Sequence, residues 1–443
     1  MMMLSTTMQS DKWIMSRRQM LKAVAAATGC ALAPGIIAFE GEPWKLSKED
    51  EAFLDDLERQ GCLFFWEQAS AKTGQILDRA RNDLTGALDP RRQASIASTG
   101  FGLSALCIAD RRGYLPHAQI VERVKSTLEW HLNSLPELHG FFYHFSDIET
   151  GERYQSVEFS SIDTSLLLCG VLTARAYFED AQIQSLARQI YERVDWPWML
   201  NGGNTFSMGW KPETEFLHSR WKTYCELMML YLLAIGSPTH AIAPEYWNYF
   251  SRPVIHYKGF DYISGNDPLF THQFSHAWYD FRGKRDAYAD YFANSVIATR
   301  AHKAFCLSLP KWYSEDYWGI TASDSAHGYT AWGGPPAQGR LDGSVVPSAA
   351  AGSLAFLPAE CLSVLRAMRS RWGKQAWGRY GFVDAFHPAA NWYDPDVLGI
   401  DQGISVLMAE NLRSGLVWST FMRNPENVSA MQRAGFHGTG LAE

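Results

Sequence analysis

Apolar residues recur at intervals of three and four along nearly the whole chain of 443 residues. This spacing places them on one face of a helix, whereas a half-buried strand would show a period of two. It predicts about twelve helices, at roughly 48–70, 93–112, 116–135, 161–178, 180–194, 220–235, 243–250, 272–280, 285–305, 345–357, 359–370 and 402–414. Strand-like runs such as 141–145 are scattered.

The order of these segments indicates the fold. Helix follows helix without the alternation of strand and helix that a parallel sheet requires, and no short repeat is visible. Twelve helices in one unit pair naturally into six antiparallel hairpins that close into a double ring. We therefore predict an all-α fold, an (α/α)6 barrel, formed by a single domain over residues 39–443.

Five long segments between the predicted helices are rich in Gly, Asp, His and Trp. They are HFSDIETGERYQSVEFSS, NGGNTFSMGWKPETEF, GFDYISGNDPLFTHQF, YWGITASDSAHGYTAWGGPPAQGRLDGS and GFVDAFHPAANWYDPDVLGID. Loops of this length inside a compact domain usually carry function. They precede even-numbered helices, which alternation assigns to the inner ring, so we expect them to meet at one end of the barrel and to form a cleft.

Charge and aromatic content indicate what such a cleft binds. The formal net charge is −7, and the first 38 residues are locally basic, so the remainder is more acidic still. An acidic body disfavours nucleic acid and other polyanions, which bind through clustered Lys and Arg. Most of the 17 Trp belong to the core by default, but flat sugar faces stack well on exposed aromatic rings. A neutral oligosaccharide or polysaccharide is the favoured partner.

The N-terminus resembles an export signal. Arg17 and Arg18 precede a modest apolar run with small residues near its end, which is typical of a twin-arginine signal over residues 1–38. The run is too short and too broken for a stable membrane span. We expect a periplasmic or secreted protein, with a lipid anchor at Cys30 as a further possibility and a chance amphipathic N-terminus as the alternative.

Hydrolysis of a glycosidic bond requires a carboxylic acid that protonates the leaving oxygen and, for inversion, a carboxylate that activates water. Glu226 lies among aromatic and apolar residues in WKTYCELMML, where desolvation would raise its pKa as a general acid needs. Its alternative is a core Glu satisfied by a neighbour. Glu158, Asp163 and Asp401 stand at predicted helix starts, where capping explains an acid equally well.

Histidines and cysteines give no recognised metal site. His272 and His276 are four residues apart, which permits shared ligation, but a third ligand at a known spacing is missing. No Cys/His metal spacing, nucleotide-binding motif or serine-nucleophile motif appears in the required context. We therefore expect no metal and no cofactor.

The sequence resembles the glucoamylase-like family that includes bacterial endo-β-1,2-glucanases and the hydrolase-like region of cyclic β-1,2-glucan synthases. The matching stretches run in order from about residue 50 to 436. They are FFWEQA, LDRA, STGFGLSAL, FFYHFSDIETGERY, VEFSSIDTSLLL, MGWKPETEFL, YCELMMLYLLAIGSPTH, PLFTHQFSHAWYDFRG, DYWGITASD, DGSVVPSAAAGSLAF and LGIDQGISVLMAEN. One departure is Thr214 between the acids of MGWKPETEF, where a smaller residue is expected in relatives.

The resemblance implies an (α/α)6 barrel that hydrolyses a β-linked glucan with inversion. It makes Glu226 the general acid and leaves the base open among Asp401, Asp147, Glu158 and Asp163. Residues expected to contact the glucan are Trp66, Arg79, His144, Asp147, Trp210, Glu213, Glu215, Trp221, Tyr224, His272, Trp278, Asp280, Trp318, Trp332 and Trp392.

The function expected from the sequence is that of an exported endo-β-1,2-glucanase. A non-catalytic glycan-binding protein, a polysaccharide lyase and a transglycosylase on the same fold are the alternatives. A lyase needs basic residues to neutralise a uronate, which suits this acidic chain poorly.

Overall fold

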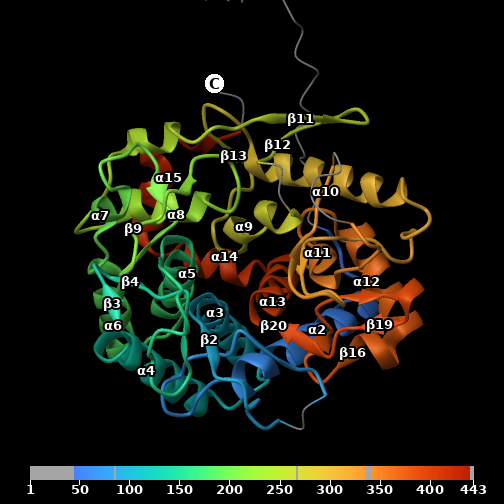
Figure 1. Ribbon diagram of the computed structural model, residues 1–443, viewed down its shortest axis with the longest axis horizontal. Helices are drawn as coiled ribbons and strands as arrows, with labels where there is room; N and C mark the ends of the chain where they lie inside the picture. The colour runs from blue at the N-terminus through green and yellow to red at the C-terminus, as the bar shows by residue number, and fades with distance from the viewer. Residues whose placement is uncertain (1–43, 84–85, 266–267, 336–340, 440–443) are drawn as a thin grey trace, which may run out of the picture. The chain divides into compact units, whose positions relative to one another are not determined.

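The computed structural model describes residues 44–83, 86–265, 268–335 and 341–439 (Figure 1). The predicted export signal and Cys30 therefore lie outside the described residues. From Trp44 onward the chain forms one folded unit. None of the helices in these ranges combines the length and the apolar character needed to cross a membrane.

Six helical segments form an outer ring and six an inner ring. The outer segments are α2 (Lys48–Glu67), α4 (His117–Asn133), α6 (Ala181–Glu192), the short 3-10 helix η1 (Pro244–Asn248), α10 (Tyr291–Leu307) and α12 (Pro358–Ala376). The inner segments are α3 (Ile96–Arg112), α5 (Ser161–Tyr177), α8 (Met228–Gly236), η2 (Leu269–His272) with α9 (Phe274–Trp278), α11 (Pro347–Ala351) and α13 (Gly399–Arg413). The two rings alternate along the chain, and Figure 1 shows α3, α5, α9, α11 and α13 around the centre.

Burial separates the two rings. Every residue of α3 from Ile96 to Ala109 is buried, as is all of α8. On α4, by contrast, Ile120, Val124 and Leu128 form one buried stripe at a spacing of four. Inner helices such as α3 and α8 are thus buried on all sides because protein surrounds them.

The strands are short, antiparallel, and lie in the connecting loops. The pairs are β1 (Arg79–Arg81) with β20 (Asp396–Leu398), β2 (Gln93–Ser95) with β5 (Phe145–Asp147), β3 (Glu137–Leu138) with β4 (Phe141–Phe142), β7 (Phe206–Ser207) with β10 (Arg220–Trp221), β11 (Val254–Tyr257) with β12 (Phe260–Ile263), β13 (Lys284–Arg285) with β21 (His437–Gly438), β14 (Ala322–Ser323) with β15 (Thr330–Ala331), β16 (Trp377–Gly378) with β17 (Gly381–Phe382) and β18 (Phe386–His387) with β19 (Trp392–Tyr393). A three-stranded sheet contains β6 (Phe159–Ser160), β8 (Gly209–Lys211) and β9 (Glu215–Phe216).

The predicted (α/α)6 barrel is confirmed, with local corrections. The helix predicted at 220–235 begins only at Met228, because Trp221 pairs with Phe206 in a strand ladder and a turn follows. The helix predicted at 345–357 is shorter, since turns follow Ala351. Three further helices were not predicted: α7 (Trp196–Leu200), α14 (Leu416–Phe421) and α15 (Pro425–Arg433). Of these, α14 packs against α3, α5, α9 and α13 at the C-terminal end of the inner ring.

A buried ion network ties α2, α3 and α13 together at that same end. Arg112 donates to both carboxylate oxygens of Glu410, at 2.8 and 2.9 Å. Arg413 donates to Glu58, and both glutamates are fully buried. Burial and the neighbouring Glu410 raise the pKa of Glu58 well above its usual range. The network thus links three helices where the site loops are absent.

Candidate active site

The long loops all precede inner helices and therefore meet at the opposite end of the barrel, as predicted. They carry a group of polar side chains at that mouth: Asp78 and Arg79 before α3, His144 and Glu158 before α5, Glu226 before α8, Asp324 and Tyr329 before α11, and Asp384 and Asp394 before α13. Asp163 and Asp401 lie in the first turns of α5 and α13.

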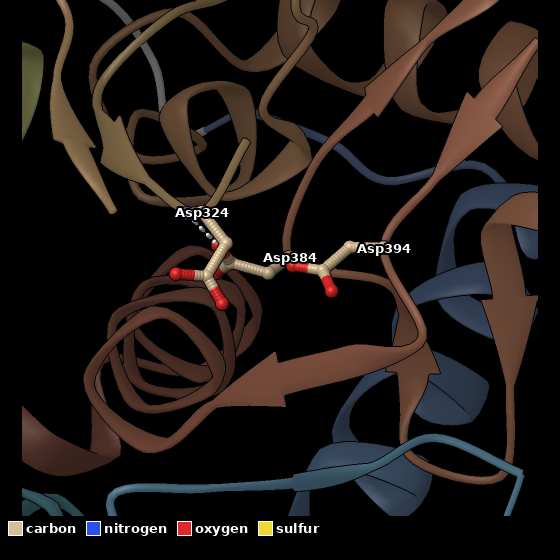
Figure 2. Close-up of side chains that lie close together, drawn as sticks. All are labelled: Asp324, Asp384 and Asp394. Carbon is tan, nitrogen blue, oxygen red and sulfur yellow. Dashed lines mark hydrogen bonds between the residues drawn. The ribbon is translucent and has the colours of Figure 1, made fainter. Parts of the chain in front are cut away.

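Three aspartates from separate loop segments converge at this mouth (Figure 2). Asp324, Asp384 and Asp394 each offer a carboxylate oxygen within 4.8 Å of the others, and all three are buried. The backbone N–H of Asp324 donates to Asp384 Oδ2 at 2.7 Å, while that of Asp396 donates to Asp394 Oδ1 at 3.0 Å. Asp384 Oδ1 and Asp394 Oδ2 receive no hydrogen bond from a donor group.

Arg79 joins this cluster to the loop before α3. Its Nε donates to Asp78 Oδ2 at 3.1 Å, and its Nη1 donates to Asp324. Asp78 is buried, and burial raises its pKa despite the neighbouring guanidinium. One arginine therefore lies among at least four carboxyl groups, which is too little positive charge to let all of them ionise at neutral pH.

Asp401 lies beside the cluster in the first turn of α13. The hydroxyl of Ser348 donates to Asp401 Oδ1 at 3.2 Å. Burial raises the pKa of Asp401 to about 6, although hydrogen bonds to Asp384 and Ser348 oppose the rise. Burial and the charge of Asp401 raise the pKa of Asp384 well above its usual range, and burial raises that of Asp394 to about 7. These carboxyls hold fewer charges than their number suggests.

A second cluster stands at the start of α5. His144 Nδ1 lies 3.3 Å from Glu158 Oε1, and its Nε2 lies 3.6 Å from Asp163 Oδ1. Burial alone would lower the pKa of His144, but the two carboxylates raise it to about 9, so the ring is an imidazolium at neutral pH. His144 in turn outweighs burial and lowers the pKa of Glu158. The hydroxyl of Ser160 donates to Asp163 at 2.5 Å and accepts the backbone N–H of Asp163 at 3.2 Å, so Ser160 caps α5 and holds this acid in place.

Glu226 lies in the turn directly before α8, and only 9% of the residue is exposed. Its carbonyl oxygen accepts a hydrogen bond from Ser275 Oγ at 2.6 Å, and Ser275 Oγ accepts the N–H of Met229 at 3.1 Å. Ser275 on α9 therefore fixes the backbone that carries this carboxyl group. The sequence placed Glu226 inside a helix, whereas the structure places it at the helix start, on the side of the mouth.

Comparison with known proteins finds similar sequences and structures. The Glycoamylase family model matches residues 218–425. An endo-β-1,2-glucanase from Chitinophaga pinensis is 29% identical, with a TM-score of 0.81 over 90% of this chain and 100% of that one. Over these residues, and in its solved relatives, the chain is similar to the glucoamylase-like family. A β-1,2-glucanase structure from Parabacteroides distasonis is 25% identical, with a TM-score of 0.79 over 88% of this chain and 60% of that one.

One curated relative is considerably longer. The exo β-1,2-glucooligosaccharide sophorohydrolase (non-reducing end) of Parabacteroides distasonis is 27% identical over 429 residues. That alignment covers 87% of this chain and 58% of the relative, so this glucoamylase-like chain spans little more than half of it.

Several aromatic residues expected in the cleft are packed inside the barrel instead. Tyr224 and Trp278 are fully buried: the Tyr224 ring stacks on Tyr291 at 5.9 Å, and the Trp278 indole donates to Ser104 at 2.9 Å. Both side chains lie in the interior of the structure, so their contact with glucan stays a prediction.

Three more residues predicted to contact glucan are buried as well. Trp318 is fully buried, and Trp332, only 4% exposed, donates to Ser323 Oγ at 2.9 Å. His272 is 3% exposed and faces Tyr224, with its Nδ1 3.3 Å from the phenol oxygen. Burial lowers the pKa values of His272 and His276 to about 3, so both rings are neutral.

Two predicted contacts lie away from the mouth. Trp66, at the end of α2, packs beneath Arg123 of α4, whose Cζ is 4.5 Å from the ring centroid, so it belongs to the outer ring. Asp280 follows α9 and pairs with Arg282 at 2.9 Å, beyond the C-terminal end of that inner helix. Spacing along the sequence does not show that Trp66 faces α4, whereas the position of Asp280 after its helix already placed it at the end opposite the mouth.

The remaining predicted contacts are partly exposed. The indole of Trp221 donates to Ser161 Oγ at 2.9 Å, which places it beside the start of α5. Glu213 pairs with Arg153, and Asp147 accepts two hydrogen bonds from Arg92. The bond to Arg92 lowers the pKa of Asp147 to about 2, so it is a weak base. Contact of Trp210, Trp221, Trp392, Glu213 and Glu215 with glucan stays a prediction.

The sequence analysis missed four acids of the mouth, Asp78, Asp324, Asp384 and Asp394. Each stands in a loop directly ahead of an inner helix, in LDRA, ITASD, GFVDAF and NWYDPD. An acid with apolar neighbours in such a loop was the available signal.

The three converging aspartates fit a metal ion poorly. Arg79 and backbone N–H groups already occupy oxygens of Asp324, Asp384 and Asp394. Few oxygens are left for a hard cation, which prefers six to eight oxygen ligands. The absence of a metal stays a prediction.

Proposed function

We propose that the chain is an exported, inverting endo-β-1,2-glucanase with Glu226 as general acid and Asp401 as general base. The observation that carries this proposal is the convergence of buried carboxyl groups at one mouth of the barrel. Asp401 among them has a pKa of about 6, which suits a base that works near neutral pH. The likeness to the Chitinophaga endo-β-1,2-glucanase supports the substrate class.

The proposed reaction uses two carboxyl groups on opposite faces of one sugar ring. Glu226 gives its proton to the glycosidic oxygen as the C1–O bond breaks. A water molecule attacks C1 from the other face, and Asp401 accepts the proton that this water loses. The products are a shortened glucan and a new reducing end with inverted configuration at C1.

The other candidate bases fit this role less well. Arg92 holds Asp147 ionised with a pKa of about 2, so it would accept a proton poorly. Glu158 and Asp163 are both paired with the imidazolium of His144. We assign these two to binding sugar hydroxyls, because ionised, paired carboxylates accept hydrogen bonds well without being consumed.

The test is digestion of linkage-defined glucans by the purified chain. We expect cleavage of β-1,2-glucan into a series of oligosaccharides, with the α-anomer appearing first in proton NMR. Release of sophorose alone would indicate exo action, and initial β-anomer would indicate retention. If no β-glucan is cleaved but one is bound, the protein is a non-catalytic glycan-binding protein.

Export is tested separately. Replacing Arg17 and Arg18 by lysine should keep the protein in the cytoplasm, while the parent chain reaches the periplasm or the medium. Labelling with a radioactive fatty acid would report lipidation at Cys30, for which Cys30→Ala is the control.

A further inference from the structure

Two buried carboxyl groups at the mouth, those of Asp384 and Asp401, line the same small pocket and interact electrostatically. Asp384 uses Oδ2 to accept the N–H of Asp324, and Asp401 uses Oδ1 to accept the hydroxyl of Ser348. The second oxygen of each, Asp384 Oδ1 and Asp401 Oδ2, has no other partner although both residues are more than nine-tenths buried. Two ionised carboxylates in one buried pocket repel each other, whereas a proton on one of them supplies the donor that these two oxygens otherwise lack.

The charged groups around Asp384 and Asp401 determine whether one of the two carries a proton. The groups that face the pair are Asp78 and Arg79 from the loop before α3, Asp324 and Tyr329 from the β14–β15 segment, and Asp394 next to β19. Leu57 of α2, Pro347 and Phe382 complete the lining with apolar surface. With a single guanidinium among these acids, a proton on one member of the pair removes a repulsion that no nearby cation cancels.

We propose that Asp384 is a positioning residue: it holds one proton and donates it in a hydrogen bond to Asp401 Oδ2, which fixes the carboxylate of the general base. This inference rests on the proposed function of Asp401. The two pKa shifts agree with a proton on Asp384. The pKa of Asp401 rises only to about 6, while that of Asp384 rises well above its usual range.

The proton of Asp384 is not consumed in the reaction. Asp401 accepts a proton from the attacking water, and that proton passes to solvent after the product leaves. Asp384 contributes by keeping the base oxygen in one orientation and by stabilising its ionised form through a donated hydrogen bond. A small pocket between the pair and Gln402 and Ser405 has a volume of about 10 Å³, so there is room for about one water molecule and no more.

The experiment compares Asp384→Asn with Asp384→Ala. The amide of Asn is neutral and can donate to Asp401 as the protonated acid does, and its oxygen can still accept the N–H of Asp324. Ala can do neither. We expect the Asn variant to keep kcat within about tenfold of the parent, whereas the Ala variant should lose about 100-fold in kcat with little change in KM.

The pH profile and an infrared measurement provide readouts that a purely structural role would not move. In the Ala variant the acidic limb of kcat/KM should shift to higher pH, because Asp401 loses a donor that favours its charged form, and the Asn variant should restore it. The infrared spectrum of the parent minus that of the Asn variant, at pH 7, should contain the carbonyl band of a protonated carboxylic acid. Asp316→Asn, an exposed site, is the control and should show neither change.

Several results would overturn the proposal. They are a parent-like pH profile in the Ala variant, an Asn variant as inactive as Asp401→Asn, and a difference spectrum without the acid band. A parent enzyme that loses activity in EDTA and regains it with Ca²⁺ would place a cation where we place a proton. If no glucan is cleaved at all, the proposed function fails, but the infrared band still decides the protonation of Asp384. If the Ala variant does not fold, the Asn variant and the band carry the test.

Discussion

Gly100 and Gly170 bring the backbones of α3 and α5 into direct contact. A Cβ atom on Gly170 would stand 2.0 Å from the carbonyl oxygen of Gly100, and one on Gly100 would stand 2.2 Å from that of Leu166. Because α3 and α5 are both inner helices, this contact sets the spacing between the loop that carries Asp78 and the one that carries His144.

Substitution of Gly100 by alanine should therefore destabilise the protein strongly. The new methyl group meets backbone atoms, which cannot move aside as a side chain can, so we expect a loss of about 3 kcal/mol in the free energy of unfolding. Urea denaturation measures it. The control is Gly373→Ala on α12, where no heavy atom lies within 4 Å of the new Cβ, and where alanine should stabilise by up to about 1 kcal/mol. Equal effects of the two substitutions would contradict the close contact.

Replacement of Glu226 by glutamine should abolish turnover and leave the fold intact. The amide keeps the shape but has no acidic proton to give, so kcat should fall by about 100-fold to 10,000-fold. Reducing-end release from β-1,2-glucan measures this, and a calorimetric titration checks that binding persists. Glu245→Gln on the exposed side of η1 is the matched control and should behave as the parent does. Full activity in the Glu226 variant would remove it from the mechanism.

His144 should make stability depend on pH in the alkaline range. Its pKa is about 9 in the folded protein, against about 6.5 in the unfolded chain. The stability that the imidazolium contributes is fully present below about pH 6.5 and is lost as pH rises through about 9. We expect the melting temperature to fall across this window in the parent and to fall less in His144→Gln. His240→Gln, an exposed site, should keep the slope of the parent, and an unchanged slope in the His144 variant would be evidence against the pairing.

Arg413 should matter for stability and not for catalysis. Its side chain is 6% exposed and contacts the fully buried Glu58, so Arg413→Ala leaves a buried carboxylate without its main partner. We expect a loss of about 3 to 5 kcal/mol at pH 7 and a smaller loss at low pH, where Glu58 can take up a proton. Arg366→Ala, which breaks an exposed pair with Glu49, should cost less than about 1 kcal/mol. A changed kcat in a folded Arg413→Ala variant would refute the claim that Arg413 does not contribute to catalysis.

The helical barrel and the gathering of loops at one mouth were predictable because they depend on apolar spacing and alternation. Those signals are local and strong over segments such as 96–112 and 161–177. The start of α8 was not predictable, because Trp221 could continue the helical pattern and instead pairs with Phe206. Only tertiary contact decides between those outcomes.

The site was harder to predict than the fold. A sequence shows that Trp278 and Trp221 are aromatic, but not that one faces Ser104 in the core and the other the start of α5. Likewise, Asp384 and Asp401 are separated along the chain by β18, β19 and β20. They come together only because β18 pairs with β19 and β20 pairs with β1. Side-chain direction and long-range convergence are properties of the folded loops.

The ion network of Arg112, Arg413, Glu58 and Glu410 lies at one end of the barrel and the carboxyl clusters lie at the other. Substitutions at the two ends should therefore act additively, since they share no contact. In evolution the loops can therefore be lengthened, shortened or exchanged to admit new glycans without destabilising the opposite end of the barrel. A library randomised only in those loops should retain folded members in abundance, which makes the barrel a tolerant starting point for new specificity.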